Sequence, residues 1–82
     1  GKSRVVATMG LMLILYRGYK KVHFVYPTNS LKEREEEEFD DYWVKSGKSD
    51  YVSYHSDFEF TMAEGEIIIN DEADHLMFTY PE

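Results

Sequence analysis

The chain has no cysteine among its 82 residues, which excludes a disulfide framework and a zinc site built on thiolates. Its longest apolar stretch, Val5 to Tyr16, is far shorter than the roughly 20 residues that a membrane-spanning helix needs. The basic segment Arg17 to Lys21 follows that stretch, in place of the small-residue cleavage site of a secretory signal. We therefore expect an intracellular, cytoplasmic protein that is not secreted and has no integral membrane segment.

Basic residues are also scarce. Lysine and arginine number 9 against 16 aspartates and glutamates, and the resulting net charge of -7 does not suit the binding of a polyanion by charge alone. The hydrophobic share of 43% and the aromatic share of 16% are nevertheless sufficient to build a buried core. The composition predicts one folded domain with an acidic surface.

The first predicted element is a helix over Val5 to Tyr16, where alanine, methionine and leucine are frequent. Gly18 follows at a place where the C-terminus of a helix favours a residue with positive φ. Because the segment is apolar on all sides, we expect this helix to be buried between two layers.

A strand and a second helix are predicted next. Lys21 to Tyr26 is rich in β-branched and aromatic residues, and Pro27 ends this strand because proline cannot donate to a continuing ladder. Ser30 is the expected N-cap of a helix over Leu31 to Lys45, with Glu33 in position to complete a capping box. Acidic side chains cover most of this helix, so we expect it on the outside, with a narrow apolar stripe of Leu31, Phe39, Trp43 and Tyr42 facing inward.

The second half of the chain reads as short extended segments. We expect a turn at Ser46 to Asp50 and extended segments at Tyr51 to Tyr54 and Phe58 to Thr61. Glu66 to Asn70 contains consecutive isoleucines, the pattern of a strand buried on both faces of a parallel sheet. With a short helical or turn segment from Glu72, this order predicts an α/β fold, a three-layer sandwich with a mainly parallel sheet.

Three short motifs follow one another, and each also has an ordinary structural explanation. Gly1-Lys2-Ser3 matches the end of a phosphate-binding loop, but a triplet of this kind is by itself more often an exposed tripeptide. Asp71-Glu72-Ala73-Asp74 follows the isoleucine strand, where open α/β sheets bind ligands, but an acidic helix cap has the same composition. Pro27-Thr28-Asn29-Ser30-Leu31 ends the earlier strand and also suits a strand-to-helix turn.

In this order the motifs resemble the first RecA-like lobe of a superfamily-two helicase or translocase, a P-loop NTPase, over nearly the whole chain. Asp71 to Leu76 looks like the DEAD-box form of the helicases. Val22 to Val25, Leu31 to Glu35 and Tyr54 to Phe60 look more like the SecA-type preprotein translocase. The resemblance therefore leaves two kinds of ATP-dependent motor open.

The resemblance implies ATP and Mg²⁺ as cofactors and a second RecA-like lobe as a partner. The motor's track would be nucleic acid, RNA rather than DNA, or an unfolded polypeptide. Residues of this chain that match the family motifs receive roles by that resemblance alone: nucleotide binding for Gly1, Lys2, Ser3 and Arg4, metal binding for Ser3 and Asp71, catalysis for Glu72 and Lys2, and contact with the track for Pro27 and Thr28.

Only the last three residues of a phosphate loop are present at Gly1 to Ser3. We therefore expect residues 1–82 to be a partial helicase or translocase ATP-binding domain, truncated within the P-loop and inactive alone. The alternative from another class is a non-catalytic α/β interaction module that binds a basic partner through the acidic helix 31–45. His23, His55 and His75 are too dispersed in sequence to predict a metal site, and we expect surface or packing roles for them.

Overall fold

The computed structural model of the chain describes residues 2–71 and 76–79. Its elements follow in the order α1 (Lys2–Arg17), β1 (Lys21–Val25), α2 (Asn29–Ser46), the 3₁₀ turn η1 (Ser49–Tyr51), β2 (Val52–His55), β3 (Glu66–Asp71) and β4 (Leu76–Thr79). The expected first helix, its C-terminal Gly18 with φ of 74°, and the strand that follows are confirmed.

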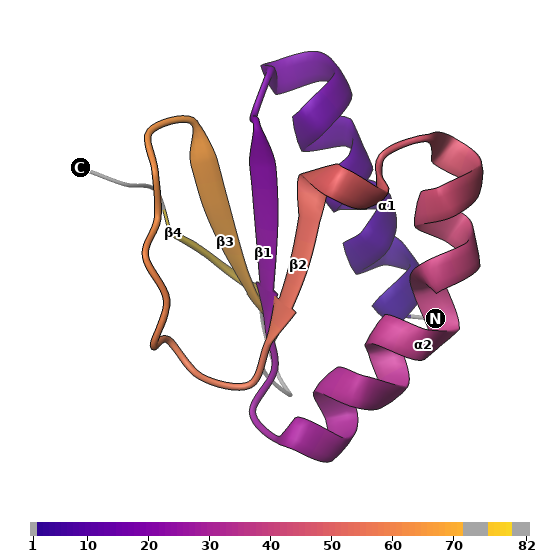
Figure 1. Cartoon of the computed structure of the whole chain (residues 1–82), viewed down its shortest axis with the longest axis vertical. Coiled ribbons are helices and arrows are strands. Elements are labelled where there is room, and N and C mark those ends of the chain that lie inside the picture. Colours follow the sequence, from indigo (N-terminus) through magenta and orange to yellow (C-terminus); the bar gives the residue numbers. More distant parts are fainter. Residues whose placement is uncertain (1, 72–75, 80–82) are drawn as a thin grey trace.

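The strands form one sheet in the order β2-β1-β3-β4 (Figure 1). β1 is central and pairs in parallel with both β2 and β3, so that Phe24 lies between Tyr54 and Ile69. Ile67, Ile68 and Ile69 are all buried, which confirms the prediction of a strand enclosed on both faces. The α/β class and the parallel pairing of three strands are therefore established.

The end of the sheet differs from the expectation. Residues 72–75 lie outside the described residues, but Leu76–Thr79 forms β4, which pairs antiparallel with β3. A helical or turn segment had been expected over this region, and that expectation is wrong for residues 76–79. Leu76, Met77 and Phe78 are consecutive apolar residues without alternation, a pattern that suits a short helix as well as a strand.

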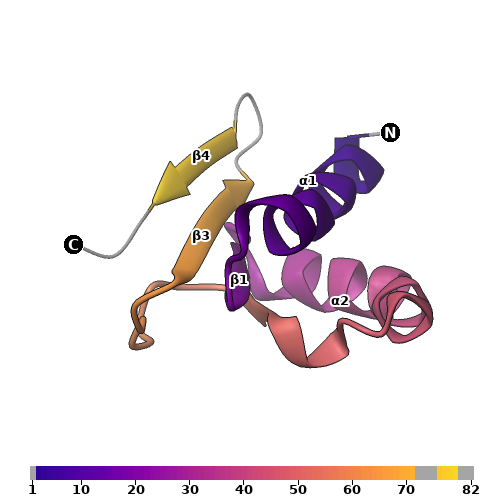
Figure 2. The same cartoon turned by 90° about the horizontal axis from the view of Figure 1, so that it is seen from above.

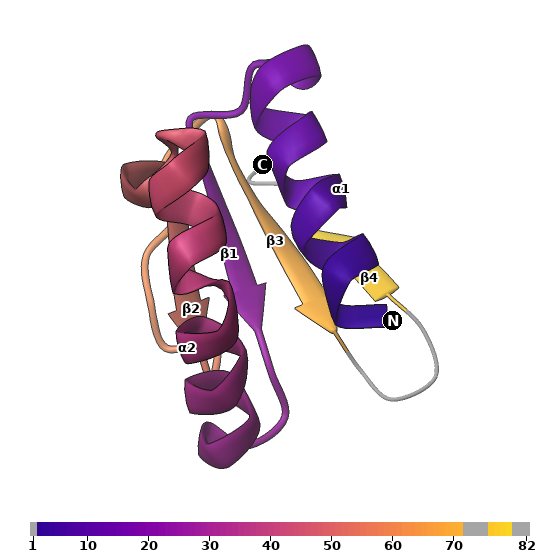
Figure 3. The same cartoon turned by 90° about the vertical axis from the view of Figure 1, so that its right-hand side faces the viewer.

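Both helices lie on one face of the sheet (Figures 2 and 3). Both helices pack on the side chain of Phe24 from β1. Its ring contacts the backbone of Gly10 in α1 and packs beside Trp43 of α2. The opposite face carries no helix among residues 2–71 and 76–79; the irregular segment 56–65, which connects β2 to β3, passes there. The described residues thus form two layers of regular structure, one of helices and one of strands.

The helix α1 is not enclosed between layers, contrary to the sequence prediction. Its buried residues Val6, Ala7 and Ile14 face the sheet. Four large apolar side chains point outward and are more than half exposed: Val5, Met12, Leu15 and Tyr16. An all-round apolar pattern predicts burial on every side, whereas the elements described within residues 2–71 and 76–79 cover only one side of the helix.

The helix α2 begins earlier than predicted, and its N-cap is Thr28 rather than Ser30. Thr28 has extended backbone angles, and its hydroxyl accepts a hydrogen bond from the N–H of Leu31 at 3.1 Å. With this cap, the third helical position is Leu31, so Glu33 cannot complete a capping box. The helix ends at Gly47, whose φ of 72° allows its N–H to bond the carbonyls of the last turn.

The inner stripe of α2 contains a carboxylate that the sequence analysis assigned to the solvent face. Glu35 is only 2% exposed and lies one and two helical turns before the buried Phe39 and Trp43. Its Oε1 is 3.4 Å from the guanidinium of Arg34, and its Oε2 has no partner among the residues described. The apolar stripe is confirmed, but the acidic run is not uniformly solvated.

Candidate functional site

The carboxyl ends of the parallel strands and the N-termini of both helices lie at the same end of the molecule (Figures 1 and 3). α1 runs back along the sheet before β1 begins, and α2 returns from the end of β1 to the start of β2. Open α/β sheets bind ligands at this end, because the free N–H groups of helix N-termini point there. This end is therefore the first candidate site.

The structure brings most of the predicted site positions to this end. Lys2 and Ser3 occupy the first turn of α1, and Asp71 is the last residue of β3; these are placed by their backbone. Pro27 and Thr28 are exposed just after β1. Gly1 and Glu72, to which the resemblance assigns nucleotide binding and catalysis, lie outside the described residues.

Arg4 and Thr28 are not placed as a nucleotide-binding or track-binding site would need them. Arg4 is exposed and lines an open cavity of about 350 Å³ on the outer side of α1, together with Val5, Thr8, Met9 and Met12. Thr28 uses its hydroxyl to cap α2, so that oxygen is already engaged. The case for a ligand at the carboxyl end therefore depends on Lys2, Ser3 and Asp71.

A cluster of aromatic and ionisable side chains lies on the sheet face opposite the helices. This histidine cluster consists of His23 from β1, His55 from β2, Glu66 from β3 and Phe60 from the connecting segment. Phe60 stacks on the His55 ring with centroids 3.8 Å apart and on the His23 ring at 4.9 Å. The strand predicted at Phe58 to Thr61 is absent; this stretch is irregular and turns Phe60 onto the histidines.

Hydrogen bonds connect the members of the histidine cluster. The Nε2–H of His23 donates to Oε1 of Glu66 at 2.7 Å, because a carboxylate can only accept. The other ring nitrogen of His23, Nδ1, is 3.0 Å from Nε2 of His55, and one of the two donates to the other. The same Glu66 oxygen also accepts the N–H of Ala63 at 3.2 Å. The cluster thus ties three strands and the connecting segment together.

Two members of the cluster have lowered pKa values in the folded chain. Burial lowers the pKa of His55, and the neighbouring His23 lowers it further. More distant charges act on the same ring: Asp57, which raises its pKa, and Lys21 and Lys32, which lower it. The hydrogen bond from His23 lowers the pKa of Glu66, against a smaller opposing effect of burial. Both groups therefore resist protonation in the folded chain more than in the unfolded chain.

The lowered pKa of His55 predicts that the folded chain loses stability when the pH falls. The unfolded chain binds a proton at His55 near its ordinary pKa of 6.5, while the folded chain does so only at lower pH. The stability that neutral His55 contributes is therefore fully present above pH 6.5, and it falls as the pH drops toward the lowered pKa of His55. We expect the urea midpoint to decrease between about pH 7 and about pH 5 by circular dichroism.

The variant His55→Gln cannot titrate in this range, so its urea midpoint is expected to change less over the same interval. Glu64→Gln, an exposed change in the same connecting segment, is the matched control and is expected to keep the full dependence. A His55→Gln variant with the same pH dependence as the parent chain would show that other groups cause the effect.

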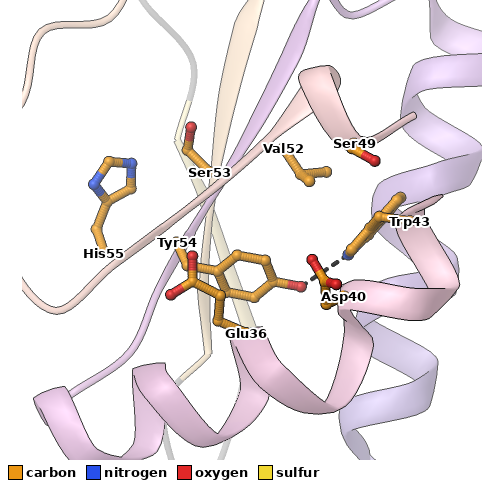
Figure 4. A pocket seen from close by; sticks show the side chains of 8 residues that line it. All are labelled: Glu36, Asp40, Trp43, Ser49, Val52, Ser53, Tyr54 and His55. Carbon is orange, nitrogen blue, oxygen red and sulfur yellow. Dashed lines mark hydrogen bonds between the residues drawn. The ribbon is translucent and has the colours of Figure 1, made fainter. Parts of the chain in front are cut away.

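An acidic groove lies at the outer edge of β2, beside α2 (Figure 4). This edge groove has a volume of about 290 Å³ and is lined by Glu36 and Asp40 of α2, by Trp43, by Ser49 and by residues 52–55 of β2. In Figure 4, Val52 and Tyr54 point toward α2, whereas Ser53 and His55 point to the other face. The indole Nε1–H of Trp43 donates to the Tyr54 hydroxyl at 2.8 Å and fixes the floor of the groove.

Several carboxylates lie close to the Tyr54 hydroxyl in the edge groove. Burial is the main cause that raises the pKa of the Tyr54 hydroxyl to about 12, and the bond from Trp43 acts against it. The carboxylates of Glu35, Glu36 and Asp40 raise this pKa further because they disfavour a second negative charge nearby. A cationic group is therefore the favoured occupant of this groove.

No family model, curated protein or solved structure matches the chain. Within residues 2–71 and 76–79, no group of three or more histidine, aspartate or glutamate side chains is arranged to hold a metal ion. No helix in that part of the chain is long and apolar enough to cross a membrane.

Sequence analysis missed the contact between His23 and His55 and the burial of Glu35. The parallel register pairs His23 with Ser53 and Val25 with His55, so the two histidines lie on the same face of neighbouring strands, two positions apart, and their rings meet diagonally. Val22 to Val25 are all buried and Val52 to His55 are all half-buried, so no alternating pattern on these two strands indicates the register.

Proposed function

We propose that the chain is part of the ATP-binding lobe of an ATP-dependent motor of the superfamily-two type, with a RecA-like, three-layer architecture in its complete form. Lys2 contacts the phosphates, and the oxygens of Ser3 and Asp71 hold Mg²⁺. The second carboxylate, Glu72, orients the attacking water. The proposal rests on the resemblance of the motifs and on one structural observation.

That observation is the position of the motifs relative to the sheet. The first turn of α1, with Lys2 and Ser3, and the end of β3, at Asp71, both lie at the carboxyl end of the parallel strands. The donor set also suits the ligand, since Mg²⁺ prefers hydroxyl and carboxylate oxygens and an ammonium group binds phosphate. The direct pairing of β1 with β3 supports the proposal, because it puts the carboxyl end of β3 beside that of the central strand.

The track of this motor is RNA in the leading form of the proposal and an unfolded polypeptide in the SecA-like form. The exposed acids of α2 favour the polypeptide, because they repel a polyanion: Glu33, Glu36, Glu37, Glu38, Asp40 and Asp41. A nucleic acid therefore has to be bound elsewhere than on α2.

Replacing Lys2 by alanine in the full-length protein is expected to weaken the binding of Mg-ATP by about tenfold to a hundredfold. A charge-assisted hydrogen bond to phosphate contributes about 1.5–3 kcal/mol, and tenfold in affinity corresponds to about 1.4 kcal/mol. Isothermal titration calorimetry with a non-hydrolysable ATP analogue and Mg²⁺ measures the effect.

Lys20→Ala is the matched control, because Lys20 is an exposed lysine beyond the other end of α1. Glu72→Gln is a second control that removes the water-orienting carboxylate and leaves the phosphate contacts intact. The proposal predicts near-normal binding in both controls. Equal affinity of Lys2→Ala and Lys20→Ala would contradict the assignment of the phosphate site.

A further inference from the structure

β2 is the outermost strand of the sheet, and its outer edge has no strand partner among the described residues. The N–H of Tyr26 donates to the carbonyl of His55 at 2.9 Å, which shows that the backbone of His55 faces β1. Because successive residues of a strand turn their N–H and C=O groups to opposite sides, the backbone groups of Val52 and Tyr54 face outward. The edge therefore offers a template on which another strand can pair.

The edge groove lies directly along this template. Val52 and Tyr54, whose backbones face outward, also direct their side chains to the α2 side of the sheet (Figure 4). Glu36 and Asp40 lie on that same side, one helical turn apart, and both line the groove. A strand added to β2 would thus place every second side chain over these two carboxylates.

The two carboxylates are available to a cation. Asp40 is exposed and has no ion pair within the described part of the chain. Glu36 is 3.2 Å from the Lys32 ammonium, but this pair is partly exposed and joins neighbouring turns of one helix. Pairs of that kind contribute only about 0.3–0.5 kcal/mol, so an incoming cation can replace Lys32.

We propose that the outer edge of β2 and the adjoining groove bind an extended, basic polypeptide segment as an additional strand. The backbone of the segment bonds Val52 and Tyr54, and lysine or arginine side chains at alternate positions contact Glu36 and Asp40. Charge complementarity selects this occupant over a nucleic acid, since the groove is acidic and the whole chain carries a net charge of -7. The proposal goes beyond nucleotide binding and uses none of the residues assigned to it.

Trp43 provides a direct measurement of occupancy, because it is the single tryptophan of the chain and lines the groove. We expect a short peptide of alternating valine and lysine to change its fluorescence in a saturable way. In nuclear magnetic resonance spectra, the amides of Val52 and Tyr54 are expected to show the largest shifts. Binding is expected to weaken with salt, because the cation contacts are only partly buried.

The controls separate strand addition from general attraction to an acidic helix. Asp40→Asn is expected to weaken peptide binding by about three- to tenfold, whereas Asp41→Asn, the same change at the adjacent residue outside the groove, is expected to leave it unchanged. The same peptide with N-methylated backbone amides keeps its charges but cannot donate to β2, so its binding is expected to be lost.

Each outcome of these measurements is decisive for the proposal. Equal binding of the N-methylated peptide, or equal weakening by Asp40→Asn and Asp41→Asn, would show charge attraction without strand pairing and would overturn it. Absence of any saturable change at Trp43, or preferential binding of a single-stranded oligonucleotide, would overturn it as well. Failure of Lys2→Ala to affect Mg-ATP has no bearing on this result, so the two proposals fail independently.

Discussion

Replacing Trp43 by alanine is expected to lower the free energy of unfolding by about 3–5 kcal/mol, the usual cost of truncating a buried tryptophan. The side chain is only 2% exposed, and its ring packs near Phe24 and edge-on against Tyr42. The truncation also removes the hydrogen bond to the Tyr54 hydroxyl. A chain of this length has a total stability of roughly 4–12 kcal/mol, so the loss is a large part of it.

Urea unfolding followed by far-ultraviolet circular dichroism measures this loss without depending on tryptophan. Val44→Ala is the matched control, because Val44 is the next residue of the same helix but is 58% exposed. We expect that control to stay within about 0.5 kcal/mol of the parent chain. Tyr54→Phe, which removes only the hydroxyl, separates the hydrogen bond from the packing and is expected to cost about 1 kcal/mol. A Trp43→Ala chain as stable as the Val44→Ala chain would refute the assigned core.

Replacing Gly10 by valine is expected to destabilise the chain by about 3 kcal/mol. A Cβ atom at this position would lie 2.6 Å from Cζ of Phe24, closer than such atoms approach in proteins. The Phe24 ring cannot move away freely, because it is buried and stacked against Tyr54 with centroids 5.1 Å apart. Overpacking of this kind costs about 1–3 kcal/mol, and the β-branched side chain adds crowding within the helix.

Gly10→Ala tests which of two opposing effects is larger. Alanine improves helix propensity over glycine by about 1 kcal/mol, while its Cβ introduces the contact with Phe24. We expect the steric cost to exceed the gain, so that this variant is about 1 kcal/mol less stable than the parent chain. Thr8→Ala, an exposed change on the same helix, is the control for propensity alone and is expected to be slightly stabilising.

The double variant Gly10→Ala with Phe24→Leu identifies the source of the cost. A smaller leucine at position 24 leaves room for the new methyl group, so the two changes together are expected to cost less than their sum. Additive effects would show that the Phe24 ring is not the obstacle. A Gly10→Ala chain more stable than the parent would show that the ring shifts without cost.

The sequence identified the elements whose local pattern and tertiary surroundings agree. The isoleucines of β3 are buried on both faces as predicted, because a continuous apolar run has no polar side to expose. The first helix was located correctly, with Gly18 at its end. Its predicted burial on all sides was wrong. Composition reports how apolar a helix is, and does not report how many neighbouring elements are available to cover it.

The features that the sequence did not predict correctly depend on contacts between segments that are distant in the chain. Thr28 and Ser30 are both good N-caps, and only the path of the chain after β1 decides between them. Glu35 looks like its acidic neighbours, but its place one turn before Phe39 turns it inward. For the candidate site, motif order predicted Lys2, Ser3 and Asp71, and their roles stay predictions. The histidine cluster and the edge groove exist only through the pairing of strands.

The central position of β1 has a consequence for how the chain acquires its structure during synthesis. Its first sheet partner, β2, ends at His55, and its second, β3, ends only at Asp71. Ribosomes add about 5–20 residues per second, so Val22 and Phe24 remain without their β3 neighbours for seconds after they emerge. Folding of the sheet is therefore tied to the last quarter of the described chain, and a nascent chain arrested before Glu66 would expose the apolar residues of its own central strand.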